Sequence, residues 1–281
     1  MATSTPPDRE LLQRRTGLRD EDLDLICSSE IFADICRENL HLILIDSAVQ
    51  EFPRNSILFM QGDPAQRFYI VLDGWVKIFR ETQDGRETVI HVFGKGESFA
   101  EPAIFEDGGY PASASACVDS RVLGIPAGSF KSRLMDNPEL FERFIVAVYR
   151  KLRLLTLQIE QLSARSATER LAGFLCDLCP READSTVLRL PLEKSVIAAM
   201  LGMQPETFSR SISKLRPHGV KIDGDTVSIV DIAALRKLSA GVQSFDAGPE
   251  FGSGRASFLT GATFGNRPDT RRFDDSSDGG H

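Results

Sequence analysis

The segment "LGMQPETFSR" (residues 201–210) holds the one acidic side chain of a basic stretch. Between residues 194 and 221 the chain carries five lysine and arginine residues but a single carboxylate, Glu206. On a helix, Glu206, Ser209 and Arg210 lie at positions i, i+3 and i+4, and therefore share one face near the amino end. An arginine can donate two hydrogen bonds to guanine O6 and N7, and a carboxylate can accept one from cytosine N4. These residue types at this spacing could therefore read base edges in the major groove of DNA.

The position of the lone acid favours this interpretation. Phosphates repel a carboxylate, so we expect one beside DNA only where a base supplies a hydrogen-bond donor. Lys214 and Arg216, farther along the same segment, suit phosphate contacts that orient the helix. Thr207 completes the set of candidate DNA-contacting residues. The alternative is that Glu206 only stabilises the helix through its dipole, since it would lie in the first turn.

The same stretch has the small and apolar side chains that a helix-turn-helix needs. Ala198 allows close helix contact, Gly202 can adopt the left-handed turn conformation, and Pro205 suits the first turn of the second helix. Leu201, Met203 and Phe208 would fill the space between the two helices. Asp223-Gly224 then joins two short β-rich runs in a hairpin, which predicts a winged helix rather than an ordinary helical hairpin.

A long helix is expected ahead of this unit. Its apolar residues recur at alternating steps of four and three, namely Phe141, Ile145, Val148, Leu152, Leu155, Ile159 and Leu162. This heptad seam is typical of a helix that pairs with a second copy of itself, and we assign the dimerisation helix to residues 137–165. Packing against its own domain is the alternative. A second helix should begin at Ser166, with Glu169 as its capping-box partner.

The amino-terminal half has a different pattern. Between residues 48 and 125, glycines separate short β-rich runs at intervals of 11 or 12 residues, which predicts an antiparallel sandwich, barrel or roll. Asp73-Gly74 and Asp84-Gly85 are expected to form hairpin turns. Short helices are predicted before these strands. The expected fold is therefore α+β, with a sensor domain at 1–135, the long helix at 137–165, a winged helix-turn-helix at 166–240 and a disordered tail at 241–281.

Bulk composition limits the class of protein. The net charge of −7 argues against a uniformly basic coat for nucleic acid, although it allows a local basic patch. No apolar run has the length of a membrane span, the first residues lack the pattern of a signal peptide, and the five cysteines are an odd number. We expect a cytoplasmic protein that does not bind membranes. The sequence contains no nucleophile–base pair, phosphate loop or HExxH run that would indicate an enzyme.

Two long motifs resemble those of one protein family. "LPLEKSVIAAMLGMQPETFSRSISKLRPHGV" is similar to the winged helix of the Crp/Fnr family of bacterial transcription regulators. "ILFMQGDPAQRFYIVLDGWVKIFRETQDGRETVIHVFGKGESFAE" is similar to the cyclic-nucleotide-type β-roll of that family. The resemblance implies a homodimer on a palindromic operator of double-stranded DNA, with RNA polymerase as a further partner. Glu206, Ser209 and Arg210 resemble the trio of the Fnr type, whose half-site is similar to TTGAT.

Two effectors of the family do not match this chain. Members that bind cyclic AMP hold its phosphate with an Arg-Ser pair, and here Pro111 and Ala112 occupy those positions, although Glu101 stands in the ribose-contacting place. A buried phosphate without partners is unfavourable, so we expect no cyclic AMP binding. Members with an iron–sulfur cluster supply four thiolates, whereas Cys27 and Cys36 are too few and too far apart. We therefore expect no iron–sulfur cluster.

Haem is the third effector that the resemblance offers. "QIEQLSARSATERLAGFLCDLCP" is most similar to the branch of denitrification regulators that respond to nitric oxide and are associated with haem. His41 and His91 are the candidate axial ligands, because they are the histidines of the sensor half. Each could instead be a structural residue, His91 in the sheet and His41 at the surface. Another small ligand, thiol redox chemistry at Cys176-x-x-Cys179, and regulation without an effector remain alternatives.

Overall fold

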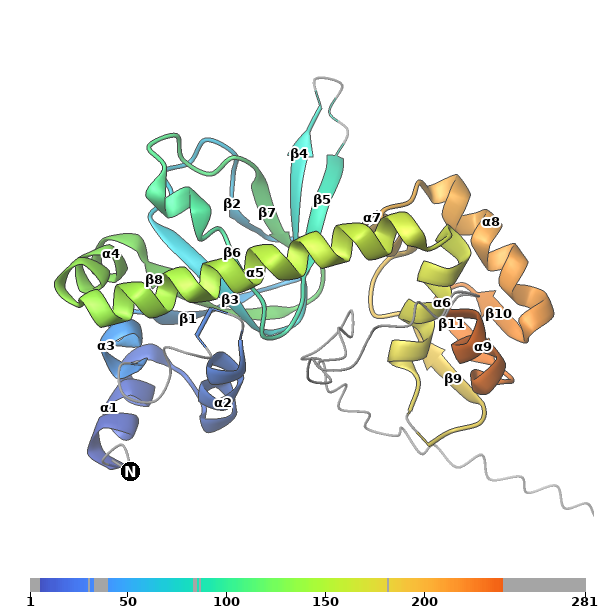
Figure 1. Cartoon of the computed structure of the whole chain (residues 1–281), viewed down its shortest axis with the longest axis horizontal. Coiled ribbons are helices and arrows are strands. Elements are labelled where there is room, and N and C mark those ends of the chain that lie inside the picture. The colour runs from blue at the N-terminus through green and yellow to red at the C-terminus, as the bar shows by residue number, and fades with distance from the viewer. Residues whose placement is uncertain are drawn as a thin grey trace, which may run out of the picture.

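The computed structural model describes residues 6–29, 31–32, 40–82, 85, 87–180 and 182–239. Figure 1 shows a β-rich domain with its helices on the left, helix α5 crossing the picture, and a smaller domain on the right. The predicted α+β fold, with a β-roll followed by a helix-turn-helix domain, is confirmed. The tail that we predict for residues 241–281 lies outside the described residues.

The β-rich domain consists of two four-stranded antiparallel sheets. Their strand orders are β1-β8-β3-β6 and β2-β7-β4-β5. The strands are β1 (Ala48–Phe52), β2 (Ile57–Phe59), β3 (Arg67–Asp73), β4 (Val76–Glu81), β5 (Glu87–Phe93), β6 (Ser98–Phe99), β7 (Ser113–Ala116) and β8 (Ser120–Pro126). β4 and β5 pair from Val76–Phe93 to Glu81–Glu87, so the connection through Gly85 is a hairpin, as predicted. Asp84 itself lies outside the described residues.

The prediction of a hairpin turn at Asp73-Gly74 is wrong. β3 pairs with β6 and β8, whereas β4 pairs with β5 and β7, so this dipeptide carries the chain from one sheet to the other. Gly74 has a φ of +86°, and a Cβ at this position would lie 2.3 Å from Oγ of Ser120. Only glycine fits here. A hairpin and a sheet crossing both require a residue with positive φ, and the sequence pattern alone does not separate them.

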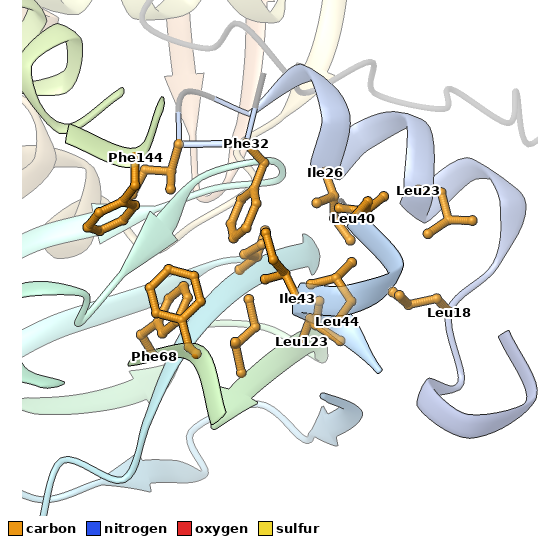
Figure 2. Packing of buried hydrophobic residues seen from close by; sticks show 14 of the residues in the cluster. Leu18, Leu23, Ile26, Phe32, Leu40, Ile43, Leu44, Phe68, Leu123 and Phe144 are labelled. Carbon is orange, nitrogen blue, oxygen red and sulfur yellow. The ribbon is translucent and has the colours of Figure 1, made fainter. Parts of the chain in front are cut away.

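Strand β3 lies between two apolar clusters. Its side chains alternate in direction, as they must in a strand. Phe68, Ile70 and Leu72 belong to the cluster under the amino-terminal helices, which Figure 2 shows together with side chains from α2, α3, β8 and α5. Tyr69 and Val71 belong to the cluster between the two sheets. This strand is buried on both faces and connects the two cores.

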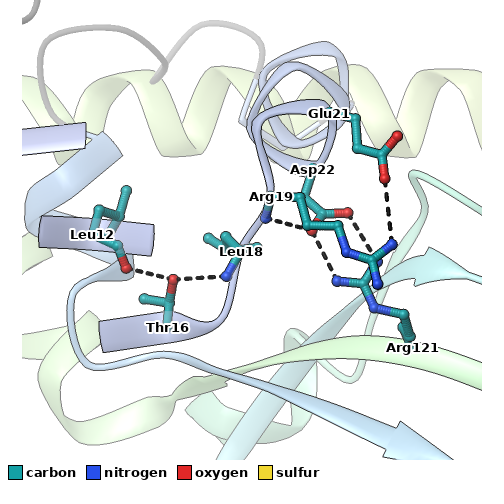
Figure 3. A network of polar contacts seen from close by, with 7 residues as sticks. All are labelled: Leu12, Thr16, Leu18, Arg19, Glu21, Asp22 and Arg121. Atoms are coloured by element: carbon teal, nitrogen blue, oxygen red, sulfur yellow. Dashed lines mark hydrogen bonds and ion pairs between the residues drawn. The ribbon is translucent and has the colours of Figure 1, made fainter. Parts of the chain in front are cut away.

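The helices of this domain cover one sheet. They are α1 (Pro6–Thr16), α2 (Asp20–Ser28), α3 (Leu40–Leu44), the short helix η1 (Pro102–Phe105) and α4 (Ala127–Asp136). A buried ion pair fastens α2 to β8, because Nη2 of Arg121 lies 3.0 Å from Oδ2 of Asp22. The same carboxylate accepts a hydrogen bond of 2.8 Å from the backbone amide of Arg19, as Figure 3 shows. Figure 3 also shows Thr16, which donates to the carbonyl oxygen of Leu12 and so ties down the end of α1.

Helix α5 (Pro138–Ala164) has two apolar faces. Its inner face buries Leu140, Phe144 and Ala147, none of which is more than 5% exposed. The predicted seam lies on the other face, where Phe141, Ile145, Val148 and Leu152 are 41–62% exposed. The side chains of Leu155, Ile159 and Leu162 lie outside the described residues. Where it is described, the seam therefore does not pack against its own domain.

The carboxyl-terminal domain combines a helix-turn-helix with a three-stranded sheet of order β10-β11-β9. Its elements are α6 (Ala167–Leu178), β9 (Thr186–Arg189), α7 (Lys194–Met200), α8 (Pro205–Leu215), the short helix η2 (Arg216–His218), β10 (Val220–Asp223), β11 (Thr226–Ile229) and α9 (Ile232–Ser239). The predicted capping box at the start of α6 is present, with Ser166 Oγ accepting from the amide of Glu169. The predicted hairpin at Asp223-Gly224 is also confirmed.

Candidate nucleic-acid interface and sensor site

The turn between α7 and α8 has the geometry that its sequence predicts. Gly202 adopts a φ of +62°, and Pro205 is the first residue of α8. Leu201, Met203 and Phe208 are each no more than 8% exposed and belong to the core of this domain. These contacts fix α8 across α7 and leave its opposite face in solvent.

That solvent face brings together the residues that we singled out as base readers. Glu206, Ser209 and Arg210 are all exposed on α8, whereas Thr207 is half-buried. Arg210 Nε donates a long hydrogen bond of 3.4 Å to the backbone carbonyl of Glu206 rather than to its carboxylate. Both residues are described in full, and no ion pair joins them. The two opposite charges are therefore available to other partners.

Two further basic side chains follow Arg210 along the chain. Lys214 is exposed in the last turn of α8, one helical turn after Arg210. Arg216 is exposed in η2, beyond the end of α8. In the wing, the carboxylate of Asp225 accepts a hydrogen bond from Arg189, which lowers the pKa of Asp225. Lys214 and Arg216 are therefore exposed cations close in sequence to the base-reading candidates, which suits contacts with a phosphate backbone.

The β-roll contacts the helix-turn-helix directly. Trp75 and Val92, on the roll, share an apolar cluster with the core of the carboxyl-terminal domain, and β5 touches α7. Trp75 is 7% exposed. At the edge of this contact, Nη2 of Arg54 lies 2.6 Å from Oε1 of Glu193, the residue before α7. The two domains therefore have a shared interface with an apolar centre and a polar rim.

A second buried carboxylate of the β-rich domain, after Asp22, is paired with α5. Glu101 is 7% exposed, and its Oε1 accepts a hydrogen bond of 2.8 Å from Nζ of Lys151. The lysine also donates to the carbonyl oxygen of Ser98 at 2.9 Å, and the hydroxyl of Ser98 donates to Glu101. Our sequence analysis missed Lys151. It continues the spacing of the inner face of α5, since Leu140, Phe144 and Ala147 precede it at steps of four, three and four.

The family resemblance places a phosphate beside Pro111 and Ala112, and neither side chain can donate a hydrogen bond to it. Ala112 is 5% exposed and Pro111 is exposed. The carbonyl oxygen of Pro111 accepts a hydrogen bond of 3.1 Å from Nε of Arg80 on β4. Arg80 is thus a cation beside this position that the sequence did not reveal, because the pairing of β4 with β7 brings it there.

The two candidate haem ligands are not brought together. His91 lies on β5 with its ring edge-on to Phe93, at a centroid distance of 4.5 Å. The side chain of His91 is exposed; partial desolvation by neighbouring atoms, and then the nearby charge of Lys151, lower its pKa. No hydrogen bond from the described residues reaches its ring nitrogens. His41 lies on α3, which packs on α1 and α4 and is far from β5 in Figure 1.

The described cysteines lie in three different parts of the fold. Cys27 packs against the cluster under the amino-terminal helices and Cys117 against the domain interface, while Cys36 lies outside the described residues. Burial raises the pKa of the Cys176 thiol to about 11, and it also raises the pKa of Cys179. Cys179 donates to the carbonyl oxygen of Leu175. Protonated thiols are poor nucleophiles, so this pair has the character of core residues.

Comparison with known proteins agrees with this architecture. The cyclic nucleotide-binding domain model matches residues 49–137, and the Crp-like helix-turn-helix domain model matches residues 169–238. The nitrogen fixation regulation protein FixK of Rhizobium meliloti is 32% identical over 185 residues, which are 64% of this chain and 82% of FixK. A CRP-like cAMP-activated global transcriptional regulator of Mycobacterium tuberculosis is 28% identical over 192 residues, which are 66% of this chain and 86% of that protein.

A solved structure extends the similarity to the whole fold. The crystal structure of a candidate cyclic nucleotide binding protein from Ruegeria pomeroyi DSS-3 superposes with a TM-score of 0.64 at 33% identity, covering 79% of this chain and 98% of that one. The named relatives are regulatory proteins rather than enzymes, and the one from Mycobacterium tuberculosis is a transcriptional regulator. Within the described residues, no helix is both long and apolar enough to cross a membrane. The chain belongs to the Crp/Fnr family of transcription regulators, and its Crp-like helix-turn-helix is a DNA-binding domain.

Proposed function

We propose that this regulator binds a palindromic operator as a homodimer, with one α8 helix in the major groove of each half-site. The observation that carries the proposal is the exposed face of α8, where Glu206 and Arg210 are one turn apart and not paired with each other. Arginine would bind guanine and the carboxylate would bind a cytosine amino group. The similarity of the trio to the Fnr type favours half-sites that resemble TTGAT.

The exposed face of α5 supports the homodimer. Phe141, Ile145, Val148 and Leu152 form an apolar row along the helix, and a soluble protein rarely leaves such a row uncovered. Heptad spacing suits a second copy of the same helix, since each apolar side chain then inserts between those of the partner. Two α8 helices in one dimer would read two related half-sites. RNA polymerase is the protein partner that we propose for such a regulator.

Selection from a pool of random DNA duplexes tests this proposal. The purified chain should enrich an inverted repeat whose half-sites resemble TTGAT. Enrichment of a single half-site would contradict the homodimer, and the absence of any enriched sequence would contradict base reading. The Arg210→Ala variant is the matched control, because it should lose the preference at one symmetric pair of positions.

For the effector we propose haem, with His91 as the residue of this chain that would bind the iron. The exposed imidazole has no hydrogen-bond partner among the described residues, and a neutral imidazole nitrogen can ligate iron; the lowered pKa of His91 favours this neutral form. Phe93 lies against the ring and supplies an apolar neighbour. When bound, haem iron would supply a site for nitric oxide. His41, on another part of the domain, would not contribute.

Absorption spectroscopy tests the haem proposal. The chain reconstituted with haemin should show a Soret band that shifts when nitric oxide is added. His91→Ala should abolish the band of the specific complex, whereas the matched variant His41→Ala should retain it. An unchanged spectrum in His91→Ala would exclude this histidine as the ligand.

A second candidate is a regulator that acts without a diffusible effector, and the Lys151–Glu101 ion pair favours it. This pair occupies the position that the family resemblance assigns to a ligand contact, and it holds α5 against the β-roll. Under this candidate, operator affinity should be the same with and without haemin or cyclic AMP. Under the haem proposal, operator affinity should change by about tenfold, as is typical of allosteric coupling.

A further inference from the structure

One arginine of α6 connects three segments of the chain. Arg170 donates from Nη1 to the carbonyl oxygen of Arg165 at 2.8 Å, just after the end of α5. Its Nε donates to the carbonyl oxygen of Leu201 at 2.9 Å, and its Nη2 donates to that of Gly202 at 3.3 Å. A single guanidinium therefore joins the α5–α6 connection to the turn of the helix-turn-helix.

The carbonyl groups that Arg170 binds in the turn cannot be satisfied within α7. The amide of Gly202 donates back to Ala199 and that of Met203 donates back to Ala198, both at 2.9 Å, so the helix ends with its amides paired. The last carbonyls of a helix have no intrahelical donor, and a cation close to them is also favoured by the helix dipole. Arg170 supplies both the donors and the charge.

The shape of the guanidinium explains why this residue is an arginine. Nε, Nη1 and Nη2 point in different directions within one plane, and each reaches a different carbonyl oxygen. A lysine would place its charge nearby but has one nitrogen, so it cannot hold the two carbonyls of the turn and that of Arg165 in the same rigid geometry.

These contacts bear on α8 because α8 begins three residues after Gly202. α6 also packs against α8, and Leu171 of α6 and Phe208 of α8 are buried in the same apolar cluster. In Figure 1, α6 follows the right-hand end of α5 and lies beside the elements of the helix-turn-helix. The direction of α8 relative to the end of α5 is therefore set partly by the apolar core and partly by Arg170.

We propose that Arg170 is a positioning residue for DNA reading, which holds α8 in the orientation that presents Glu206 and Arg210 to their bases. It does not itself contact DNA, since its donors are directed at the protein backbone. In a dimer, the reading helices must lie at the spacing of the two half-sites, and both orientations are set from the ends of the α5 pair. This inference rests on the proposed function of α8.

The test compares Arg170→Lys and Arg170→Gln with Arg236→Lys. Arg236 is the matched control, because it also donates to a backbone carbonyl, that of Pro180, but at the other end of α6. Binding is measured by titration on two duplexes, the operator enriched by the wild-type chain and a scrambled duplex of equal length. For Arg170→Lys we expect the ratio of operator affinity to scrambled-duplex affinity to fall by about tenfold, as for the loss of hydrogen bonds to a charged group.

Further measurements distinguish a misplaced α8 from a general loss of folded protein. Affinity for the scrambled duplex should stay within about twofold of wild type, because phosphate contacts tolerate a small rotation of α8. Base preference should relax at the positions read by Glu206 and by Arg210 together, which loss of folded protein would not produce. Arg236→Lys should keep the wild-type ratio. If Arg170→Gln does not fold, Arg170→Lys alone decides the outcome.

The possible results are distinct. Equal loss on both duplexes, or an unchanged ratio in Arg170→Lys, would overturn the proposal for Arg170 while leaving base reading by α8 intact. A wild-type chain that prefers no duplex at all would instead overturn the proposed function.

Discussion

Nζ of Lys151 lies 2.8 Å from Oε1 of Glu101 and joins helix α5 to the β-roll inside the sensor domain. The glutamate side chain is 9% exposed and the lysine side chain 24% exposed, so the pair is largely shielded from water. A buried carboxylate is tolerated only with a partner. α5 carries the predicted dimer seam on its other face, and this ion pair therefore connects the core of the β-rich domain to the helix that would hold the two subunits together.

Removing either partner of the Lys151–Glu101 pair should lower the free energy of unfolding, but by different amounts. Lys151→Met leaves the carboxylate buried with only Ser98 as a partner, and we expect the free energy of unfolding to fall by about 2–3 kcal/mol, less than for a fully buried pair. Glu101→Gln should cost less, since the partly exposed lysine can turn to solvent. The double variant should lose less than the sum of the two. Urea denaturation of the four proteins measures this, and additive losses would mean that the two groups do not interact.

The exposed face of α5 should control assembly. Leu152→Glu and Leu155→Glu would place facing carboxylates in an apolar seam, and we expect monomers at micromolar concentration in sedimentation experiments. Met135→Glu is the matched control, because Met135 on α4 is 81% exposed but lies outside the seam. A dimeric Leu152→Glu variant would show that another surface forms the dimer.

Arg210 and Glu206 should affect base preference in different ways. Arg210→Ala should weaken operator binding and relax the preference at one symmetric pair of positions, by about 1–3 kcal/mol. Glu206→Ala removes a charge that phosphates repel, so non-specific binding should stay level or rise while the preference at its own base pair falls. Titrations on operator variants measure both effects. If Glu206→Ala leaves base preference intact, Glu206 serves only the end of the helix.

Lys214 provides the comparison for these two variants. Because a phosphate contact carries no sequence information, Lys214→Ala should weaken binding to all duplexes alike. The slope of log affinity against log salt should become shallower by about one unit. A change in base preference would instead place Lys214 against a base.

The single tryptophan reports on the contact between the domains. A Cβ on Gly94 would lie 2.8 Å from the ring of Trp75, which is buried at that contact. Gly94→Ala should therefore displace the ring, shift its fluorescence emission to longer wavelength and lower the free energy of unfolding by about 1–3 kcal/mol. Gly128→Ala is the control, since a Cβ on Gly128 of α4 would meet nothing within 4 Å. An unshifted emission in Gly94→Ala would mean that the interface absorbs the added methyl group.

The thiol of Cys176 should make stability depend on alkaline pH. Its pKa is raised by burial to about 11, above the value of an unfolded thiol. The stability that comes from keeping this thiol protonated is complete below the unfolded pKa, and it is lost as the pH rises through the folded pKa. Cys176→Ala should therefore lose less stability than wild type between pH 8 and about pH 11, as measured by thermal denaturation. Parallel curves for the two proteins would contradict the shift.

Much of the DNA-binding domain could be predicted from the sequence, because its signals are local. A turn that needs positive φ requires Gly202, and a helix start favours Pro205 and the Ser166–Glu169 box. The placement of Glu206, Ser209 and Arg210 on one face followed from helical spacing alone.

The features that the sequence did not reveal are contacts between segments far apart in the chain. Asp73-Gly74 has the composition of a hairpin, but sheet pairing makes it a crossing between sheets. Lys151 has the spacing of a core position, yet only the packing of α5 on the roll brings it to Glu101. His41 and His91 are equivalent candidates in the sequence, and the fold separates them.

The sequence by itself therefore determined the order of elements, the turn of the helix-turn-helix, the helix face shared by Glu206, Ser209 and Arg210, and the apolar spacing along α5. The tertiary structure alone decided that Lys151 neutralises Glu101, that Trp75 lies in the domain interface, and that Arg170 reaches the turn before α8. The physical reason is the range of the interactions. Capping, turn and periodicity signals act within a few residues, whereas a buried charge or an unpaired carbonyl group can be satisfied by any donor that the fold brings near.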